Sequence, residues 1–194
     1  MSRRERIDFG RDPVADGWTI ALWSATADLL LCRYVNRTEG EFDQAGRWRR
    51  RHLCHALVGR PADQARAAAM AQHFCSTVRL SARTYATGLS AYARRSFEIA
   101  FAGRLTARLR AALATARADP LSGHGEAAEA NDAALRALGL ERPAIPDSEG
   151  ISSWDRKAAR HGKAAADNIS LVLRERVAGA GTPRPARAQP QLPF

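Results

Sequence analysis

The chain has 194 residues, of which 45% are hydrophobic and 26% are charged, close to the averages of globular proteins. Its 30 lysine and arginine residues outnumber 20 acidic residues, which gives a formal net charge of +10 and a pI near 10.8. Because no apolar run approaches the ~20 residues of a membrane span, and the charged N-terminus lacks a signal-peptide pattern, we expect a cytoplasmic protein with no membrane partner.

The N-terminal residues are polar and charged, and they predict a flexible basic arm over residues 1–16. A helix is expected to follow, from Trp18 to Leu31. Its apolar residues recur at helical spacing, which predicts one buried stripe, formed by Trp18, Leu22, Ala25 and Leu29.

Two extended segments come next and predict an antiparallel hairpin. They are Cys32–Val35 and Trp48–Val58, and the polar and glycine residues between positions 39 and 46 supply the turn. Apolar residues occur on both sides of the second strand, with Leu53 and Leu57 on one side and Cys54, Ala56 and Val58 on the other. We therefore expect both faces of the sheet to be buried near the end of this strand.

Four further helices are expected downstream. The first two cover residues 61–80, where Pro61 suits the first turn, and residues 91–118. The third covers residues 126–138, and the last begins near Trp154, with Ser153 as its cap. The expected buried stripes of the first two are Ala65, Met70, Phe74 and Val78, and then Phe97, Phe101, Leu105, Leu109 and Leu113.

Residues Ile169–Leu173 have the composition of a short strand, which we expect to join the hairpin because two strands alone are seldom stable. The proline-, glycine- and alanine-rich residues 177–194 predict a disordered tail. The sequence therefore predicts a single, helix-rich α+β domain over residues 17–176. In it, a small antiparallel sheet of about three strands packs against four or five helices.

Four segments carry a resemblance to known domain families: the first helix from Trp18 to Leu30, the strand-to-helix junction Leu57–Met70, residues Arg95–Leu109, and residues Trp154–Leu171. In the order of these elements and the placement of small residues, the chain resembles the bacterial and phage families catalogued as domains of unknown function 2786 and 7168. The resemblance covers residues 17–174 and includes no catalytic signature. It implies an α+β fold and a phage or mobile-element setting.

Of the 30 basic residues, only Lys157 and Lys163 are lysine, and all others are arginine. An arginine side chain can hold a phosphate with two hydrogen bonds and can stack on a base, so this excess favours a nucleic-acid partner. A genome of high GC content also enriches arginine, and the composition leaves both explanations open. If the charge is functional, guanidinium groups from distant segments should gather on one continuous face.

Two basic segments are the candidate nucleic-acid-binding sites. The first places guanidinium groups beside an indole on a strand or turn, where they could neutralise phosphates and stack an unpaired base. The same pattern also protects an edge strand from aggregation. The first segment consists of Arg47, Trp48, Arg49, Arg50 and Arg51, and the second, on the last helix, of Arg156, Lys157, Arg160 and Lys163.

Histidine and cysteine residues invite a test for metal binding or catalysis. On a strand, His52 and Cys54 point away from His55, and His73 and Cys75 diverge by about 200° on a helix, so we predict no metal site and no cofactor. Asp155 and His161 fall on different faces of the last helix, so no catalytic residue is predicted. The three cysteines, Cys32, Cys54 and Cys75, are expected to be free thiols.

These patterns predict a non-catalytic protein that binds DNA or RNA mainly through arginine–phosphate contacts. One alternative is a protein-interaction adaptor or virion component with an acidic protein partner, whose exposed anchors would include Trp18, Trp23 and Trp154. A further alternative is a metal-dependent hydrolase that uses the histidine and cysteine residues. The choice between DNA and RNA, the sequence preference and the oligomeric state stay open.

Overall fold

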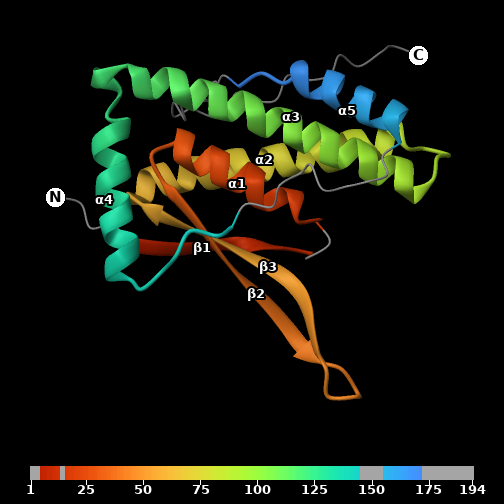
Figure 1. Ribbon diagram of the computed structural model, residues 1–194, viewed down its shortest axis with the longest axis horizontal. Coiled ribbons are helices and arrows are strands. Elements are labelled where there is room, and N and C mark those ends of the chain that lie inside the picture. Colours follow the sequence, from red (N-terminus) through yellow and green to blue (C-terminus); the bar gives the residue numbers. More distant parts are fainter. Residues whose placement is uncertain (1–4, 14–15, 145–154, 172–194) are drawn as a thin grey trace, which may run out of the picture.

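The computed structural model describes residues 5–13, 16–144 and 155–171. These residues form one sheet of three antiparallel strands and five α-helices, and this confirms the predicted helix-rich α+β class (Figure 1). Helices α1, α2 and α4 contact the sheet, and α5 packs on α3. The sheet order is β1-β3-β2. The strands are β1 (Glu5–Pro13), β2 (Arg33–Phe42) and β3 (Trp48–Gly59), and β3 lies in the centre, between the two others.

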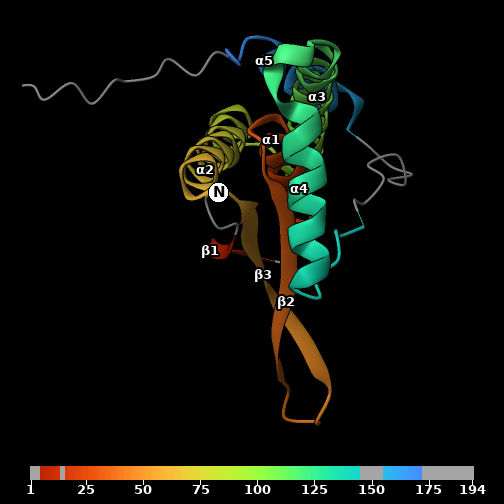
Figure 2. The same cartoon turned by 90° about the vertical axis from the view of Figure 1, so that its left-hand side faces the viewer.

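The helices cover both faces of this sheet. Figure 2 shows α2 and α4 on opposite sides of α1. The main core joins one sheet face, through Tyr34 and Leu57, to α1, α2 and α3, whereas Leu135 of α4 packs on Val35 and Val58 of the other face. Both faces of β3 are therefore buried near its end, as predicted. The helices are α1 (Trp18–Leu29), α2 (Pro61–Tyr85), α3 (Ala91–Ala118), α4 (His124–Ala137) and α5 (Arg156–Asp167), with a short 3-10 turn, η2, at Pro120–Ser122.

Helix α1 is buried on almost every side, rather than along the single stripe that its periodicity predicts. Thr19, Ser24 and Thr26 are buried together with the apolar residues, because α1 contacts α2, α3 and β2. The Thr26 hydroxyl donates to the carbonyl oxygen of Leu22 at 2.8 Å, which gives it a partner within the helix. In α2 the predicted stripe is correct at Met70, Phe74 and Val78 but wrong at Ala65, which is exposed.

Helices α3 and α5 pack closely through small residues. The predicted α3 stripe from Phe97 to Leu113 is buried. On α5, Ala158, Gly162 and Ala166 are buried against it. A Cβ atom added to Gly162 would lie 2.5 Å from the carbonyl oxygen of Phe97, so the absence of a side chain there permits the close approach.

The structure differs from the sequence-based prediction at both ends of the chain. Part of the expected N-terminal arm is strand β1, because Ile7 and Phe9 alternate with charged residues, and the sheet's third strand comes from there. Residues 169–171 are not a strand, because Ile169 continues the turn that ends α5. Asp155, rather than Ser153, caps α5 by accepting from the backbone N–H of Ala158. Ser153, Trp154 and the predicted tail 177–194 lie outside the described residues.

None of the helices in the described part of the chain combines the length and the apolar character that crossing a membrane requires.

Candidate nucleic-acid interface

Strands β2 and β3 extend beyond the rest of the sheet as a two-stranded arm. Strand β1 ends at Pro13, which lies opposite His52, whereas the pairing of β2 with β3 continues to Phe42 and Trp48. Proline has no backbone N–H to continue the ladder. We call residues 40–51 the hairpin arm, and both ribbon views show it projecting away from the helices (Figures 1 and 2).

The turn at the tip of the arm is organised by Asp43. Its carboxylate accepts hydrogen bonds from the backbone N–H groups of Ala45 and Arg47, at 3.0 and 2.9 Å. It also accepts from the Arg49 guanidinium at 3.0 Å. The hydrogen bond from the Arg47 backbone, together with the one from Arg49, lowers the pKa of Asp43 below its ordinary value. The turn is therefore fixed by an ionised side chain.

The two faces of the arm differ in charge. Side chains alternate along each strand, so Arg49 and Arg51 share one face with Glu41 and Asp43. There, Arg49 pairs with Asp43 at 3.0 Å and Arg51 with Glu41 at 2.7 Å. This face, which we call the paired face, has its basic groups matched by acids.

The other face, which we call the open face, consists of Phe42, Trp48 and Arg50. The rings of Phe42 and Trp48 meet edge to face with their centroids 5.1 Å apart, yet the two residues stay 69% and 51% exposed. Arg50 lies opposite Gly40 and has no ion-pair partner among the described residues. The open face therefore offers aromatic rings beside an unmatched cation.

The register of the arm depends on Gly40, which follows a bulge between Glu39 and Gly40. A Cβ atom there would lie 2.2 Å from the carbonyl oxygen of Arg49 and 2.9 Å from the Trp48 ring. Only glycine leaves room for both neighbours, so Gly40 allows β3 and the Trp48 ring to pack closely against β2.

The second candidate segment lies far from the hairpin arm. Helix α5, which carries Arg156, Lys157, Arg160 and Lys163, packs on α3 at the opposite end of the molecule from the arm (Figures 1 and 2). All four residues are exposed. The expected single continuous basic face is therefore wrong for these two segments, which form separate surfaces.

Many arginines outside the two segments also form ion pairs with carboxylates. Arg33 is buried and binds Asp28 and Asp132, and its hydrogen bond lowers the pKa of Asp132. Burial opposes the charge of Arg33, but both carboxylates hold its pKa above the ordinary value. Other arginines that pair with acids are Arg6, Arg11, Arg37, Arg60, Arg79, Arg94, Arg95, Arg104 and Arg142. Many arginines are therefore paired with acids of the same chain, and net charge alone is a weak guide to binding.

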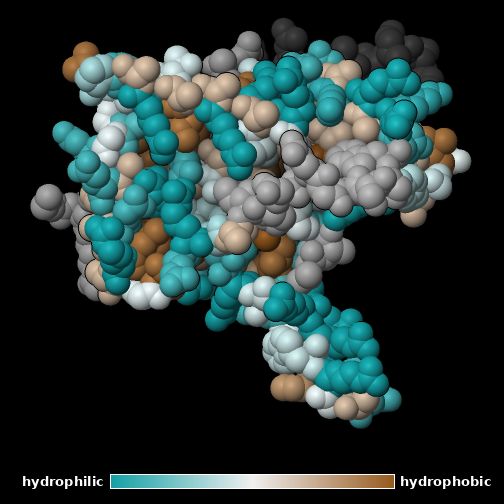
Figure 3. Space-filling model, in the orientation of Figure 1, coloured by the Kyte–Doolittle hydropathy of each residue, from teal (hydrophilic) through white to brown (hydrophobic). Residues whose placement is uncertain are grey.

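Figure 3 shows the hydropathy of the surface in the orientation of Figure 1: hydrophilic residues cover most of the hairpin arm, and hydrophilic residues alternate with apolar ones over α3 and α5.

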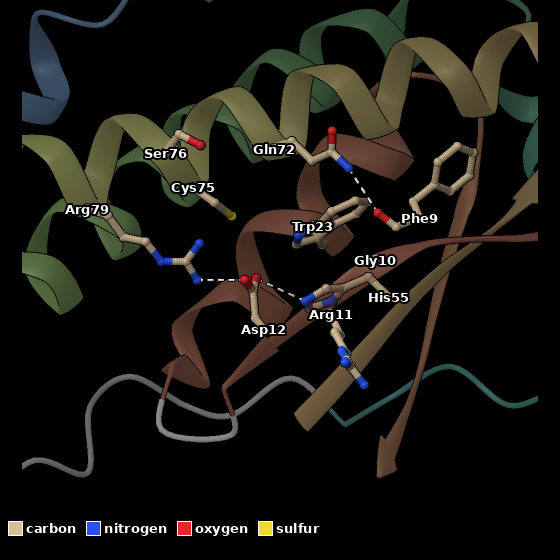
Figure 4. Close-up of a pocket in the computed structure, with 10 residues that line it drawn as sticks. All are labelled: Phe9, Gly10, Arg11, Asp12, Trp23, His55, Gln72, Cys75, Ser76 and Arg79. Atoms are coloured by element: carbon tan, nitrogen blue, oxygen red, sulfur yellow. Dashed lines mark hydrogen bonds and ion pairs between the residues drawn. The ribbon is translucent and has the colours of Figure 1, made fainter. Parts of the chain in front are cut away.

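A small polar cavity of about 170 Å³ lies where β1 meets α2 (Figure 4). Asp12 accepts a hydrogen bond from Nε2 of His55 at 3.0 Å and pairs with Arg79 at 2.8 Å. Burial alone would raise the pKa of Asp12, but the hydrogen bond from His55 and the charge of Arg79 outweigh it and lower the pKa. The ionised carboxylate can only accept, so Nε2 of His55 carries a proton.

The rest of this network is closed to a substrate. The Tyr34 hydroxyl lies 2.6 Å from Nδ1 of His55, the Trp23 ring stacks on the imidazole at 4.8 Å, and both aromatic side chains are buried. Both ring nitrogens of His55 are therefore occupied. Burial raises the pKa of the nearby Cys75 thiol to about 12, which makes it a poor nucleophile. The side chains around the cavity join β1 to β3 and α2. Among the residues that line the cavity, no free general base lies beside a reactive nucleophile.

The histidine and cysteine residues lie at separate places in the fold. All three cysteines are buried free thiols. Burial raises the pKa of Cys32 to about 12 and also raises the pKa of Cys54. His52 and His55 lie on opposite sides of β3, and His73 is exposed on α2. In the described ranges, no three or more His, Cys, Asp or Glu side chains come together in a way that could hold a metal ion.

Sequence reasoning missed Phe42 and Asp43. Trp18 is 9% exposed, as its place in the predicted buried stripe requires, and Trp23 is 2% exposed, so neither can be an exposed anchor of the alternative adaptor. Trp154 lies outside the described residues. Phe42 could have been found by counting back from the turn, because it pairs with Trp48 across the hairpin. Asp43 carries the signal of an Asx turn ahead of Gly46.

No family model, no curated protein and no solved structure matches this chain. The resemblance to the two domain families therefore stays a prediction.

Proposed function

We propose that the protein binds nucleic acid through the hairpin arm, without catalysing a reaction. The observation that supports this most is the open face, where the exposed Phe42 and Trp48 rings lie beside the unmatched Arg50 guanidinium. The proposal depends on this local combination and not on the net charge of the chain.

The dimensions of a β-ribbon suit a nucleic-acid groove. The major groove of B-DNA admits a two-stranded ribbon, and the arm extends beyond the helices, so its approach is unobstructed. In that approach, Arg47 at the tip and Arg50 on the open face would contact phosphates. On a single strand, Trp48 would stack against an unpaired base.

The paired face has a different role in this proposal. Arg49 and Arg51 are exposed and bound to acids, and exposed ion pairs contribute only about 0–1 kcal/mol. In the arm they join the side chains of β3 to Glu41 of β2 and to Asp43 of the turn. A phage or mobile-element setting and a cytoplasmic location belong to the same proposal, and they rest on the sequence alone.

A matched pair of variants tests the proposal. We expect Arg50→Ala to weaken binding to duplex DNA or RNA and to make the slope of log affinity against log salt less negative by about 0.9. Arg49→Ala removes the same charge from the paired face and should change the slope by much less. Equal effects would mean that binding depends on overall charge and would overturn the hairpin assignment.

The stacking part of the proposal has its own test. Trp48→Ala should weaken binding to a single-stranded oligonucleotide roughly tenfold, because stacking on one aromatic side chain contributes about 1–3 kcal/mol. Fluorescence anisotropy with single-stranded DNA and RNA of the same sequence measures this loss and also shows which is preferred. Unchanged affinity in Trp48→Ala would remove the stacking role.

A further inference from the structure

A groove of about 1080 Å³ runs between α3 and α5, at the end of the molecule opposite the hairpin arm. Its floor consists of small and apolar residues from both helices: Ile99, Ala100 and Ala107 from α3, and Ala159 from α5. Short side chains on the floor let a third backbone approach closely, as in the packing of α5 on α3.

The rim of the groove is basic. Arg156, Arg160 and Lys163 follow one another at spacings of four and three residues, which places them on one side of α5. None of these three forms an ion pair with another residue in the described part of the chain. Across the groove, Arg104 pairs with Asp167 at 2.7 Å. The rim therefore has an excess of positive charge that nothing described in the fold offsets.

We propose that this groove binds an amphipathic helix of an acidic protein partner. An apolar floor between two helices suits the apolar stripe of a third helix, and a cationic rim suits acidic residues that flank such a stripe. A nucleic acid could pair with the basic rim, but its phosphate backbone would then lie against the exposed Ala107 and the apolar floor around it. The combination of floor and rim therefore favours a protein partner.

The basic C-terminal part of the chain does not have the charge that the groove requires. Residues 172–194 contain Arg174, Arg176, Arg184 and Arg187 but only one acidic residue, Glu175. Like charges would oppose their docking against the rim. A separate acidic protein therefore complements the charge of the rim better than residues 172–194 do.

This inference goes beyond the proposed nucleic-acid binding and uses different residues. It also separates the members of the second candidate segment. Lys157 does not line the groove. It lies on an adjacent side of α5 together with His161, whose ring centroid is 5.1 Å from that of Tyr85. Lys157 and Lys163 thus form a matched pair on one helix: they have the same chemistry, and only Lys163 is at the groove.

The experiment uses the full chain and a fluorescein-labelled peptide of about 18 residues, because shorter helices are marginal in water. The peptide carries leucines at helical spacing flanked by glutamates, and its control is a scrambled peptide of the same composition. We expect the helical peptide to bind more tightly than the scrambled one in fluorescence anisotropy. Lys163→Glu should weaken its binding about tenfold, and Lys157→Glu should change it less than twofold.

A second pair of variants tests the floor. Ala107 is exposed and lines the groove, so Ala107→Phe should fill the floor and abolish peptide binding while the fold persists. Ala114 is also exposed on α3 but does not line the groove, so Ala114→Phe is the control. Circular dichroism confirms that both variants are folded.

Three results would overturn the inference. One is equal binding of the helical and scrambled peptides, which is also the result if residues of the chain itself fill the groove. Another is equal weakening by Lys157→Glu and Lys163→Glu. The third is loss of DNA binding in Lys163→Glu with peptide binding unchanged, which would assign the rim to nucleic acid. Arg50→Ala should leave peptide binding unaltered, so failure here is distinguishable from failure of the hairpin proposal.

Discussion

Single residues in the polar cavity decide how β1 is held. Asp12 joins three elements, because its carboxylate binds His55 of β3 and Arg79 of α2 from its own position on β1. Asp8 lies on the same strand, but its side chain is 54% exposed, and among the described residues its ion-pair partner is Arg6. On one strand, Asp12 therefore belongs to a buried network, whereas Asp8 belongs to a surface ion pair.

We expect Asp12→Asn to destabilise the fold by about 2 kcal/mol at neutral pH, because hydrogen bonds to a charged partner are lost. Asp8→Asn should be almost neutral, because exposed ion pairs contribute little. Urea unfolding followed by circular dichroism measures both. Similar losses in the two variants would mean that the cavity network does not stabilise β1.

The pKa of Asp12 also gives a pH dependence. Its pKa is lowered in the folded chain, so the ionised carboxylate stabilises the fold above the ordinary value of 3.8, and this stabilisation is lost as the pH falls through that value and below. The thermal midpoint of the wild-type chain should therefore fall more steeply than that of Asp12→Asn between about pH 5 and pH 3. Parallel curves would contradict the assignment.

Helix α5 depends on a close approach to α3, with Gly162 at the point of that approach. It has 12 residues, a length at which an isolated helix is marginal in water, so packing on α3 must stabilise it. Gly162 makes that packing possible, since a Cβ atom there would overlap the Phe97 carbonyl. Gly103 of α3 has no atom within 4 Å of an added Cβ and provides the comparison.

Gly162→Ala should release α5 from α3 at a cost of about 1–3 kcal/mol, as overpacked contacts do. Hydrogen exchange would then show loss of protection in residues 156–167 while α1 and the sheet stay protected. Gly103→Ala should leave exchange unchanged and slightly stabilise α3, because alanine favours helix over glycine. Retained protection of α5 in Gly162→Ala would show that α3 can move to accept the methyl group.

The elements also show where sequence reasoning succeeds. The bounds of α3 match the predicted 91–118. Three signals define this helix: large apolar residues at every fourth position, a serine N-cap at its start and Pro120 after its end. Strand β1 was missed because charged residues surround Ile7 and Phe9, and charge is typical of a flexible terminus as well as of an edge strand. Local patterns could not distinguish these two states, because the β3 residues that pair with β1 lie 39 to 54 positions away in the chain.

At the scale of the whole molecule, distances between segments are the part that the sequence could not predict. The composition of Arg47–Arg51 identified an exposed basic turn, but which arginines are matched by acids follows from the register of β2 and β3. The separation of the hairpin arm from α5 follows from the packing of α5 on α3, which no local pattern encodes. The sequence therefore predicted which segments are basic and exposed, but it did not predict which of them lie on the same surface.

Because β1 completes the sheet, a chain that begins at Asp16 should be much less stable than the full chain. It loses the hydrogen bonds between β1 and β3 and the contact of Phe9 with the core. It also loses Asp12, which leaves His55 and Arg79 without this carboxylate. We expect a thermal midpoint lower by about 10 °C or more, and association through the exposed edge of β3 in size-exclusion chromatography. Arg11→Ala, at an exposed position of β1, should shift the midpoint by less than about 2 °C. An unchanged midpoint in the truncated chain would restore the flexible-arm interpretation.

The burial of all three thiols makes the protein suited to site-selective labelling. Maleimides react with thiolates, and the pKa values of Cys32 and Cys75, at about 12, leave almost no thiolate at neutral pH. A cysteine introduced at the exposed Ala45, at the end of the hairpin arm, should therefore take up a fluorophore ahead of the native thiols. One dye at this position would report encounters at the tip in real time, without the removal of any native residue from the core.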